Sequence, residues 1–305
     1  MKNQILELNR NPALSDWFDA QLDLLIENKI YQDNAVKIRD GLVKKLSLYS
    51  KEHKVDQVVI GMSGGIDSAL TANLFKLAGW TVTPVVMPIY QDPEETGRGI
   101  DAANSMGTEY IVRDLSSMYD KIINDMTGDH IEISCDNLAA KKRRGNIRAR
   151  LRMITLYDLA SQKGGLVAST DNFSELATGF WTLHGDVGDV APIQSLTKSW
   201  EVPACAASIP EIPVSIIQAK PTDGLGIANG DEDQFGYSYL EFDIALLSTM
   251  ADIWAPGITP QDQSIIDSVM SRIKSTTFKR DNPHNMDHPL DKKRFTGLSK
   301  LDSNL

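Results

Sequence analysis

The sequence predicts an α/β protein: a doubly wound parallel sheet with helices on both faces, followed by C-terminal helices. Segments typical of strands alternate along the chain with segments typical of helices, which favours a parallel sheet. The first strand, residues 58–61, is apolar without alternation, as expected for a strand covered on both faces. A glycine-rich turn joins this strand to a helix. These observations indicate a Rossmann-like fold that binds ligands at the carboxyl ends of its strands.

The individual elements follow from apolar spacing and turn chemistry. Apolar residues three or four apart predict a helix over 35–53, ahead of the first strand. Thr259 and Pro260 suit the N-cap and first position of a late helix. Polar stretches rich in Gly, Pro, Asp or Glu predict loops at 91–99 and 218–235. Further strands are expected at 81–88, 109–115 and 166–170, and further helices at 66–77, 100–106 and 260–275.

Composition limits the class of protein. The chain has 305 residues, 42% of them apolar, and 31 Lys and Arg against 41 Asp and Glu give a net charge of −10. This charge argues against general affinity for nucleic acid or an anionic membrane. No segment approaches ~18 consecutive apolar residues, so we expect a soluble cytoplasmic protein. Cys135 and Cys205 form no CxxC, so no disulfide framework or zinc site is expected.

The glycine turn predicts a phosphate site. In VVIGMSGGIDSAL (58–70), Gly64 and Gly65 allow positive φ and leave amide donors unpaired at the start of a helix. Ser63 and Ser68 add hydroxyl donors, and such donors favour an anion. Asp67 would repel a phosphate unless a divalent cation lay between them, and Mg²⁺ prefers such oxygen ligands. The turn therefore predicts a magnesium-bound polyphosphate.

Three other interpretations compete for this turn. A bare Gly-Gly could form only a tight strand-to-helix turn. A P-loop is excluded, because GxxxxGK[ST] needs a Lys that does not follow these glycines. GMSGG also matches GxSxG, the nucleophile elbow of serine hydrolases, with Ser63 as nucleophile and His284 or His288 as base. This hydrolase alternative is disfavoured, because it leaves Asp67 unexplained and no HGGG-type segment precedes the turn.

A long helix is predicted between the third and fourth strands. One apolar stripe, spaced by 4, 3 and 4 residues, is expected to be buried; its members are Ala149, Met153, Leu156 and Ala160. Asn146, Arg150 and Tyr157 share another face, which is a candidate ligand wall. Local positive charge near the helix start suits a polyanionic ligand; it comes from Lys141, Lys142, Arg143, Arg144, Arg148, Arg150 and Arg152. Of these, Lys141 and Lys142 are expected to belong to an ordinary solvated helix start.

The segment SGGIDS resembles the signature of the N-type ATP pyrophosphatases. Further blocks resemble the NAD synthetase family in particular, in the family's order. They are GNIRARLRMITLY (145–157), STDNFSELATGFWTLHGD (169–186), DVAPIQSLTK (189–198), IPEIPVSIIQAKPTDGL (209–225), DEDQFGYSYLEFD (231–243) and TTFKR (276–280). The resemblance spans roughly residues 45–283 and implies ATP-dependent amidation of deamido-NAD with ammonia, which yields NAD, AMP and pyrophosphate.

The resemblance also implies roles for individual residues. Asp67, Lys198 and Asp186 would be catalytic, and Asp67 and Glu175 would hold Mg²⁺. The ATP side would comprise Ser63, Gly64, Gly65, Ser68, Gln91, Thr170, Lys198 and Thr222. The deamido-NAD side would comprise Tyr49, Asn146, Arg150, Tyr157, Asp186, Asp189 and Lys279. Lys279 and Arg280 match a pair that closes over the site. The family further implies a homodimer with its deamido-NAD site at the two-fold interface.

Some positions depart from the family pattern. Leu183 stands where many ammonia-using members have Lys, Phe278 stands where they have His, and Val86 replaces the usual adenine-contacting Arg. Glutamine-dependent members carry an extra nitrilase-like domain, for which this chain has no room, so free ammonia, or ammonia from a separate glutaminase, is expected. We expect a single domain over 1–305, with a helical extension at 1–33 and a C-terminal lid or tail at 276–305. The alternatives left open are another N-type pyrophosphatase, such as a GMP synthetase-like enzyme, and a silent adenine-nucleotide-binding module.

Overall fold

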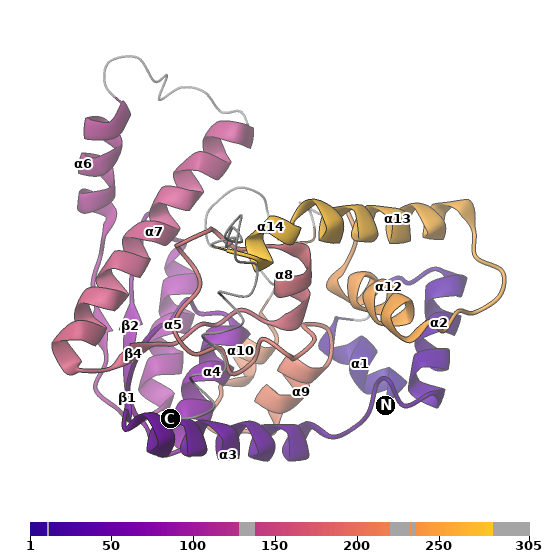
Figure 1. Ribbon diagram of the computed structural model, residues 1–305, viewed down its shortest axis with the longest axis horizontal. Coiled ribbons are helices and arrows are strands. Elements are labelled where there is room, and N and C mark those ends of the chain that lie inside the picture. Colours follow the sequence, from indigo (N-terminus) through magenta and orange to yellow (C-terminus); the bar gives the residue numbers. More distant parts are fainter. Residues whose placement is uncertain (11, 128–137, 220–231, 233–235, 283–305) are drawn as a thin grey trace, which may run out of the picture.

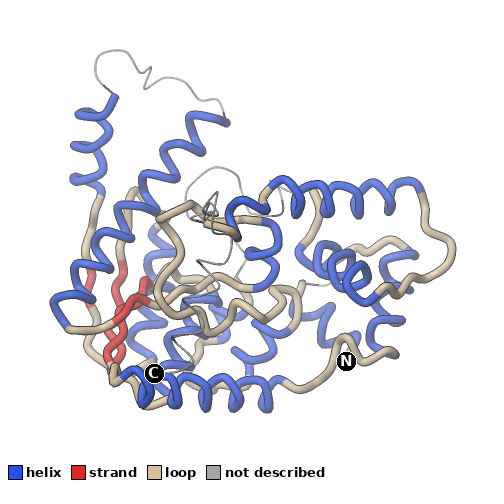
Figure 2. The backbone as a smooth tube through the Cα atoms, in the orientation of Figure 1, coloured by secondary structure: helices blue, strands red, loops and turns tan. Residues whose placement is uncertain are grey.

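The computed structural model describes residues 1–10, 12–127, 138–219, 232 and 236–282 (Figures 1 and 2). Four strands and a larger set of helices form the described part. The strands are β1 (Gln57–Gly61), β2 (Thr81–Val86), β3 (Ile111–Val112) and β4 (Leu166–Val167). The first helices are α1 (Lys2–Leu8), α2 (Asp16–Glu27), α3 (Ala35–His53), α4 (Ile66–Leu77), α5 (Pro93–Ser105), α6 (Ser116–Thr127) and α7 (Leu138–Lys163). The later ones are α8 (Phe173–Thr178), α9 (Glu201–Ala207), α10 (Val214–Ile217), α12 (Tyr239–Ala251), α13 (Pro260–Ser275) and α14 (Thr277–Arg280).

The sheet is parallel, in the order β3-β2-β1-β4, and this confirms the predicted fold class. In the central pair Val59 lies opposite Thr83, and Gly61 lies opposite Val85. β3 and β4 are only two residues long, so the predicted strands at 109–115 and 166–170 were too long. The order reverses between β1 and β4, which places their carboxyl ends at the switch point where such sheets bind ligands.

Helices cover both faces of the sheet, so the side chains of β1 are buried on both faces. Val58 and Ile60 belong to the apolar cluster that contains Leu70 and Leu74 of α4. Val59, which points the opposite way, packs in a separate cluster with residues of α6 and α7. The uniformly apolar strand is therefore explained by two covered faces, as predicted.

One predicted loop is a helix. The prediction of a loop at 91–99, with a helix starting at residue 100, is wrong for most of its length, because α5 already begins at Pro93. Asp92 caps this helix by accepting a hydrogen bond from the amide of Glu94 at 2.7 Å, and Pro93 occupies the first turn. The glycines at 97 and 99 suggested a loop, but the N-cap and the proline in the first turn favour a helix more strongly.

The buried stripe of α7 also differs from the prediction. Ala149 and Ala160 are buried as expected, whereas Met153 and Leu156 are only partly covered. The other buried positions of the helix include Leu151, Thr155 and Leu159. α7 packs on β1 and β4 of the sheet and also contacts α6. It therefore buries a wider part of its surface than a single apolar stripe would.

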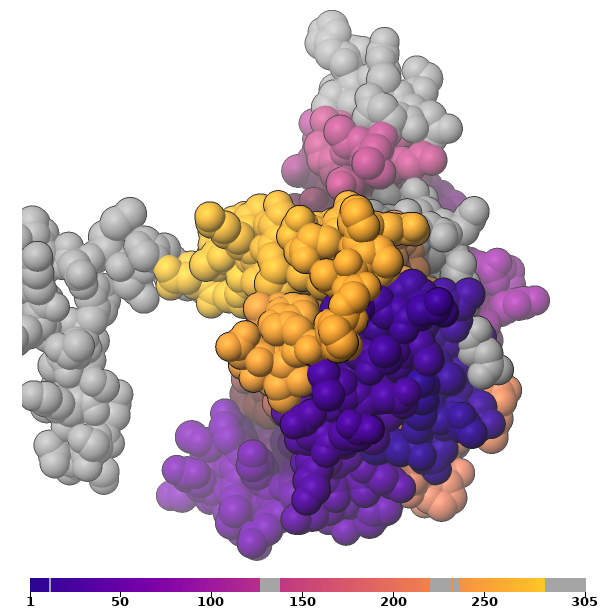
Figure 3. Space-filling model, turned by 90° about the vertical axis from the view of Figure 1, so that its right-hand side faces the viewer, coloured from indigo at the N-terminus to yellow at the C-terminus, as the bar shows by residue number. Residues whose placement is uncertain are grey.

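The N-terminal helices belong to a third apolar cluster, away from the sheet. Phe18 and Leu22 of α2 pack there with Phe242 of α12 and Val269 of α13. Figure 3 shows the indigo N-terminal segment beside the orange chain of α12 and α13. Within the described ranges, no helix is both long and apolar enough to cross a membrane.

Candidate active site

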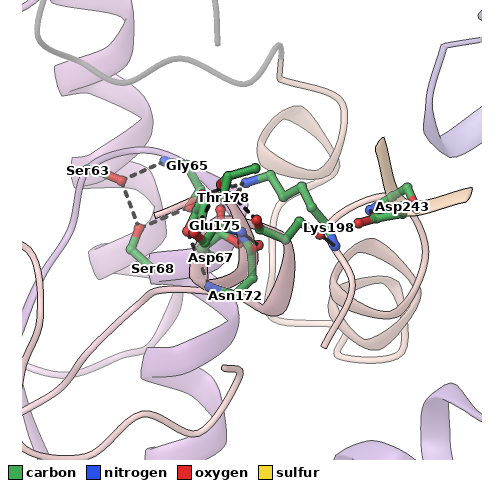
Figure 4. Close-up of polar contacts among 11 residues, drawn as sticks. Ser63, Gly65, Asp67, Ser68, Asn172, Glu175, Thr178, Lys198 and Asp243 are labelled. Carbon is green, nitrogen blue, oxygen red and sulfur yellow. Dashed lines mark hydrogen bonds and ion pairs between the residues drawn. The ribbon is translucent and has the colours of Figure 1, made fainter. Parts of the chain in front are cut away.

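The glycine turn lies at the carboxyl end of β1 and leads directly into α4 (Figure 4). Gly65 is the N-cap of α4, and no side chain caps the helix start. Ser63 Oγ accepts a hydrogen bond from Gly65 N at 3.2 Å and lies 3.2 Å from Ser68 Oγ, which in turn donates to Gly65 O at 3.0 Å. Two hydroxyls and the first amides of a helix thus converge, an arrangement that suits an anion.

The turn is held by a close backbone approach of α5. Gly64 has a φ of +88°, and a Cβ there would lie only 2.3 Å from the carbonyl oxygen of Glu95. A Cβ on Gly99 would lie 2.8 Å from the carbonyl oxygen of Met62. Both contacts require glycine, so the segment that the sequence suggested as a loop is a rigid wall of the site. Gln91 adds a hydrogen bond from Nε2 to Ser63 O at 3.2 Å.

The two predicted metal ligands face one lysine (Figure 4). Lys198 Nζ forms an ion pair with Asp67 Oδ2 and lies 3.9 Å from Glu175 Oε1. Asp67 comes from α4, Glu175 from α8 and Lys198 from the segment before α9, so the three side chains lie far apart in the sequence. All three are largely buried, with side-chain exposures of 16%, 15% and 9% respectively.

Asn172 connects the carboxylates, and sequence reasoning missed it. Its Nδ2 donates to Asp67 Oδ1 at 3.0 Å, while its Oδ1 accepts from Glu175 N at 3.0 Å as the N-cap of α8. Glu175 Oε2 completes the capping box by accepting from Asn172 N at 3.2 Å. The Asn-x-x-Glu spacing is the signal that could have identified this cap in the sequence.

The site contains more carboxylates than nearby cations. Burial and the charge of Asp67 hold the pKa of Glu175 well above its usual range, although Lys198 opposes the shift. Burial, together with the charges of Asp186 and Asp67, raises the pKa of Asp171 to about 7. Sequence reasoning also missed Asp171. Because these groups repel one another, an additional positive charge bound among them would stabilise their ionised forms.

The predicted ligand wall of α7 lies against the segment 182–189. Thr182 Oγ1 donates to Asn146 Oδ1 at 2.7 Å, and Arg150 Nε donates to Leu183 O at 3.2 Å. Tyr157 donates its hydroxyl to Asp189 Oδ1 at 2.9 Å. Partial burial and this bond raise the pKa of Tyr157 to about 12. Asp189 Oδ2 also accepts from the amide of Val167 in β4 at 2.9 Å, so Asp189 ties the wall to the sheet.

Asp186 and Lys279 lie close to this wall. Asp186 accepts from Thr182 N at 2.6 Å. Asp186 is exposed by surface area, but protein atoms surround its carboxyl group, and this desolvation raises the pKa of Asp186. The hydrogen bond from Thr182 and the charges of Arg152 and Lys279 oppose the shift. Lys279 Nζ donates to Gly179 O at 2.6 Å, and its charge lies 5.4 Å from the centre of the Trp181 ring.

Lys279 and Arg280 of α14 both donate hydrogen bonds to backbone carbonyl groups of this chain. Arg280 donates to Ala177 O at 2.7 Å and to Ile273 O at 2.6 Å. Phe278, the residue of α14 directly before this pair, is 59% exposed. The predicted closing of this pair over the site stays a prediction.

Several predicted residues are not gathered here. Tyr49 of α3 stacks on Trp80, which precedes β2 and so lies at the opposite edge of the sheet from the turn. Thr170, by contrast, follows the carboxyl end of β4 and stands two residues before Asn172, so it borders the site, where it is partly buried. Val86 is buried in β2. Thr222 lies outside the described residues, as do His284 and His288, the proposed bases of the hydrolase alternative. In the described chain, no histidine forms a hydrogen bond with Ser63.

Comparisons with known proteins give the family. The family model described as NAD synthase matches residues 38–283. An NH(3)-dependent NAD(+) synthetase from Finegoldia magna is 35% identical over 219 residues, covering 70% of this chain and 86% of that protein. One from Pyrococcus furiosus is 37% identical over 220 residues, covering 70% of this chain and 79% of that protein.

Solved structures agree with this match. The structure of an NMN synthetase from Francisella tularensis aligns with a TM-score of 0.70 at 25% identity, over 83% of this chain and 99% of that one. An NH3-dependent NAD synthetase from Campylobacter jejuni aligns with a TM-score of 0.64 at 27% identity, with the same coverage of both chains. The chain belongs to the NAD synthase family.

Proposed function

We propose that this chain is an ammonia-dependent NAD synthetase, a ligase that amidates deamido-NAD at the expense of ATP. The observation that carries the proposal is the convergence of the glycine turn with Asp67, Glu175 and Lys198. A helix start without a side-chain cap suits a phosphate chain, and the lysine supplies a cation beside it. The family membership supplies the reaction to which these parts belong.

In the first step, the nicotinate carboxylate attacks the α-phosphorus of ATP, and pyrophosphate leaves. Ser63, Ser68 and the amides of the turn would bind the leaving pyrophosphate, because charge gathers on its oxygens as the bond breaks. Lys198 would turn from Asp67 toward these oxygens and neutralise part of that charge. Holding both reactants at one sheet edge removes much of the entropic barrier.

The residues present fit a magnesium ion. Asp67 and Glu175 offer hard oxygen donors. Burial and the charge of Asp67 raise the pKa of Glu175, so a cation bound between the two carboxylates would stabilise their ionised forms. We propose that these two carboxylates hold Mg²⁺. The bound ion would neutralise phosphate charge during adenylation.

In the second step, ammonia attacks the acyl carbon of the adenylate, and AMP leaves. We assign the wall formed by Asn146, Arg150 and Tyr157, with Asp186 and Asp189, to the binding of deamido-NAD. Arg150 and Lys279 offer cations to the diphosphate of this substrate. The charge of Asp186 acts on Asp171, and we propose that Asp186 orients the nicotinate end.

Incubation of the purified chain with ATP, Mg²⁺, ammonium and deamido-NAD tests the proposal. Over many turnovers NAD, AMP and pyrophosphate should form in equal amounts, and NAD and AMP should each depend on all three substrates. Formation of ADP and phosphate, or the absence of NAD, would contradict the assignment. Hydrolysis of an added ester substrate in the absence of ATP would favour a serine hydrolase instead.

A second candidate substrate is nicotinate mononucleotide. The alignment with an NMN synthetase motivates it, since NMN carries the same nicotinamide end as NAD and lacks the adenylate half. Running the assay with each substrate separates the two activities. A higher kcat/KM for deamido-NAD supports the first candidate, and a higher value for the mononucleotide supports the second.

Arg150→Ala is expected to raise the KM for deamido-NAD about tenfold, because one charge-assisted hydrogen bond to the substrate is lost. The KM for ATP and kcat should change little. Steady-state kinetics with each substrate varied in turn measure this difference. Lys142→Ala is the matched control, since Lys142 is an exposed cation near the start of the same helix. An unchanged KM in Arg150→Ala would remove Arg150 from the substrate site.

We also propose that the enzyme is a homodimer that pairs through α7. Ile154 is 58% exposed on the same helix face as Arg150 and Tyr157, and an apolar side chain there suits a protein contact. Light scattering should give about twice the chain mass of 33.7 kDa. Ile154→Glu should shift the protein toward the monomer, whereas Met250→Glu, on α12, should not. A monomeric wild type would contradict the proposal.

A further inference from the structure

The N-terminal segment reaches the loop that carries Lys198. Ser199 O accepts a hydrogen bond from Asn9 Nδ2 at 2.7 Å, and Ser199 Oγ lies 3.2 Å from the hydroxyl of Tyr31. Trp200 Nε1 donates to the carbonyl oxygen of Gln32 at 2.9 Å. Three contacts from residues 9–32 therefore fix the two residues that follow Lys198.

Asp243 of α12 holds the same loop from another side (Figure 4). Its Oδ2 accepts from Ser199 N at 2.9 Å, and its Oδ1 accepts from Ser174 Oγ at 2.5 Å. Ser174 Oγ in turn accepts from Lys198 N at 2.9 Å. All the hydrogen-bonding groups of Ser199 are thus bound, and the residue is only 1% exposed.

The contacts with the N-terminal segment continue in the apolar cluster below the loop. Trp200 packs there with Ile5 and Phe18, and so does Ala177 of α8, the helix that carries Glu175. The N-terminal segment therefore shares an apolar cluster with the loop that carries Lys198 and with the helix that carries Glu175.

Such support matters because a lysine has a long side chain with several rotatable bonds. Its ammonium group reaches Asp67 and Glu175 only while the backbone at residue 198 stays in place. A shift of about 1 Å in a reacting group can slow a reaction by orders of magnitude. The contacts of Asn9 with the carbonyl group of Ser199 and of Tyr31 with its hydroxyl hold the residue next to Lys198 and so limit this shift.

We infer that residues 1–33 form a positioning element for Lys198, with Asn9 and Tyr31 as positioning residues. This segment lies outside the family match, which begins at residue 38. The inference rests on the proposed function, since it assumes that Lys198 acts on the phosphates of ATP. Its effect should therefore be confined to adenylation.

The test uses the full chain with Asn9→Leu and Tyr31→Phe, singly and together. Single-turnover mixing with ATP and deamido-NAD, without ammonia, measures pyrophosphate release. In the double variant its rate should fall roughly tenfold, because buried bonds to the loop are removed. The rate of NAD formation when ammonia is added to preformed adenylate should be unchanged. Tyr31→Phe alone, which removes one hydroxyl, keeps the test valid if the double variant does not fold.

Gln21→Leu is the matched control for lost stability. Gln21 is fully buried in the same segment, but it bonds to Ser248 Oγ and Ile253 O, both at 2.8 Å, and lies away from the Lys198 loop. It should lower the thermal midpoint without slowing pyrophosphate release, when all rates are measured well below each midpoint.

Two outcomes would overturn the inference. One is an unchanged rate of pyrophosphate release in the double variant, and the other is equal slowing in Gln21→Leu. A wild-type protein that releases no pyrophosphate from ATP would instead contradict the proposed function, so the two failures are distinguishable.

Discussion

Asp67→Asn is expected to reduce NAD formation by about a thousandfold or more. The substitution keeps the shape of the side chain and an oxygen that can accept from Asn172, but it removes the charge that faces Lys198 and the proposed metal. Loss of one carboxylate ligand weakens the metal site, and electrostatic stabilisation of the developing phosphate charge is commonly the largest catalytic contribution. Glu175→Gln should have a similar effect through the other ligand.

Steady-state rates across a magnesium titration measure this effect. Both variants should need more Mg²⁺ for half-maximal rate, since the remaining carboxylate binds the ion alone. Asp101→Asn is the control, because Asp101 is an exposed carboxylate of α5. Wild-type rates in Asp67→Asn would refute the assignment of Asp67 to the metal, and an unchanged magnesium requirement in both variants would refute the site as a whole.

The parts of the fold that local chemistry determines could be predicted from the sequence. The bounds of α4 match the prediction, because a buried strand, two glycines and a helix pattern follow one another directly. The late helix from Pro260 was found for a similar reason, since Thr259 caps it through Asp262. In both cases each signal lies within a few residues of the boundary it defines.

Elements that depend on distant contacts were predicted less well. The glycine at 99 suggested a loop, but it is needed where α5 approaches the turn, and that approach is visible only in three dimensions. The ends of β3 and β4 depend on where neighbouring strands stop pairing. The buried face of α7 includes Leu151 and Thr155 because β1, β4 and α6 all contact the helix, which a single apolar stripe could not reveal.

The candidate site divides in the same way. The turn residues share one short motif, so the sequence indicated both their place and their chemistry. Asn172 and Asp243 escaped notice, because Asn172 bonds to a residue 105 positions away and Asp243 to one 69 positions away. The Lys198 loop likewise depends on Asn9, at a separation of 190 residues from Ser199. No pattern along the chain contains such contacts.

Gly64→Ala is expected to abolish ATP binding and to lower the free energy of unfolding by at least about 2 kcal/mol. At a φ of +88° an alanine is strained, and its Cβ would lie 2.3 Å from Glu95 O and 3.1 Å from Gly99 N. These are backbone atoms of α5, so relief requires the helix or the turn to move. Either movement would displace the amides that are proposed to bind the pyrophosphate.

Denaturant unfolding and equilibrium binding of ATP measure the two effects, and Gly97→Ala is the control. Gly97 belongs to the same helix, but a Cβ there has no neighbour within 4 Å. Because alanine favours a helix over glycine, this control should gain about 0.5–1 kcal/mol and keep its affinity for ATP. If Gly64→Ala bound ATP as the control does, the nucleotide phosphates would have to bind elsewhere, since no arrangement of this turn accommodates both the added methyl group and the present backbone.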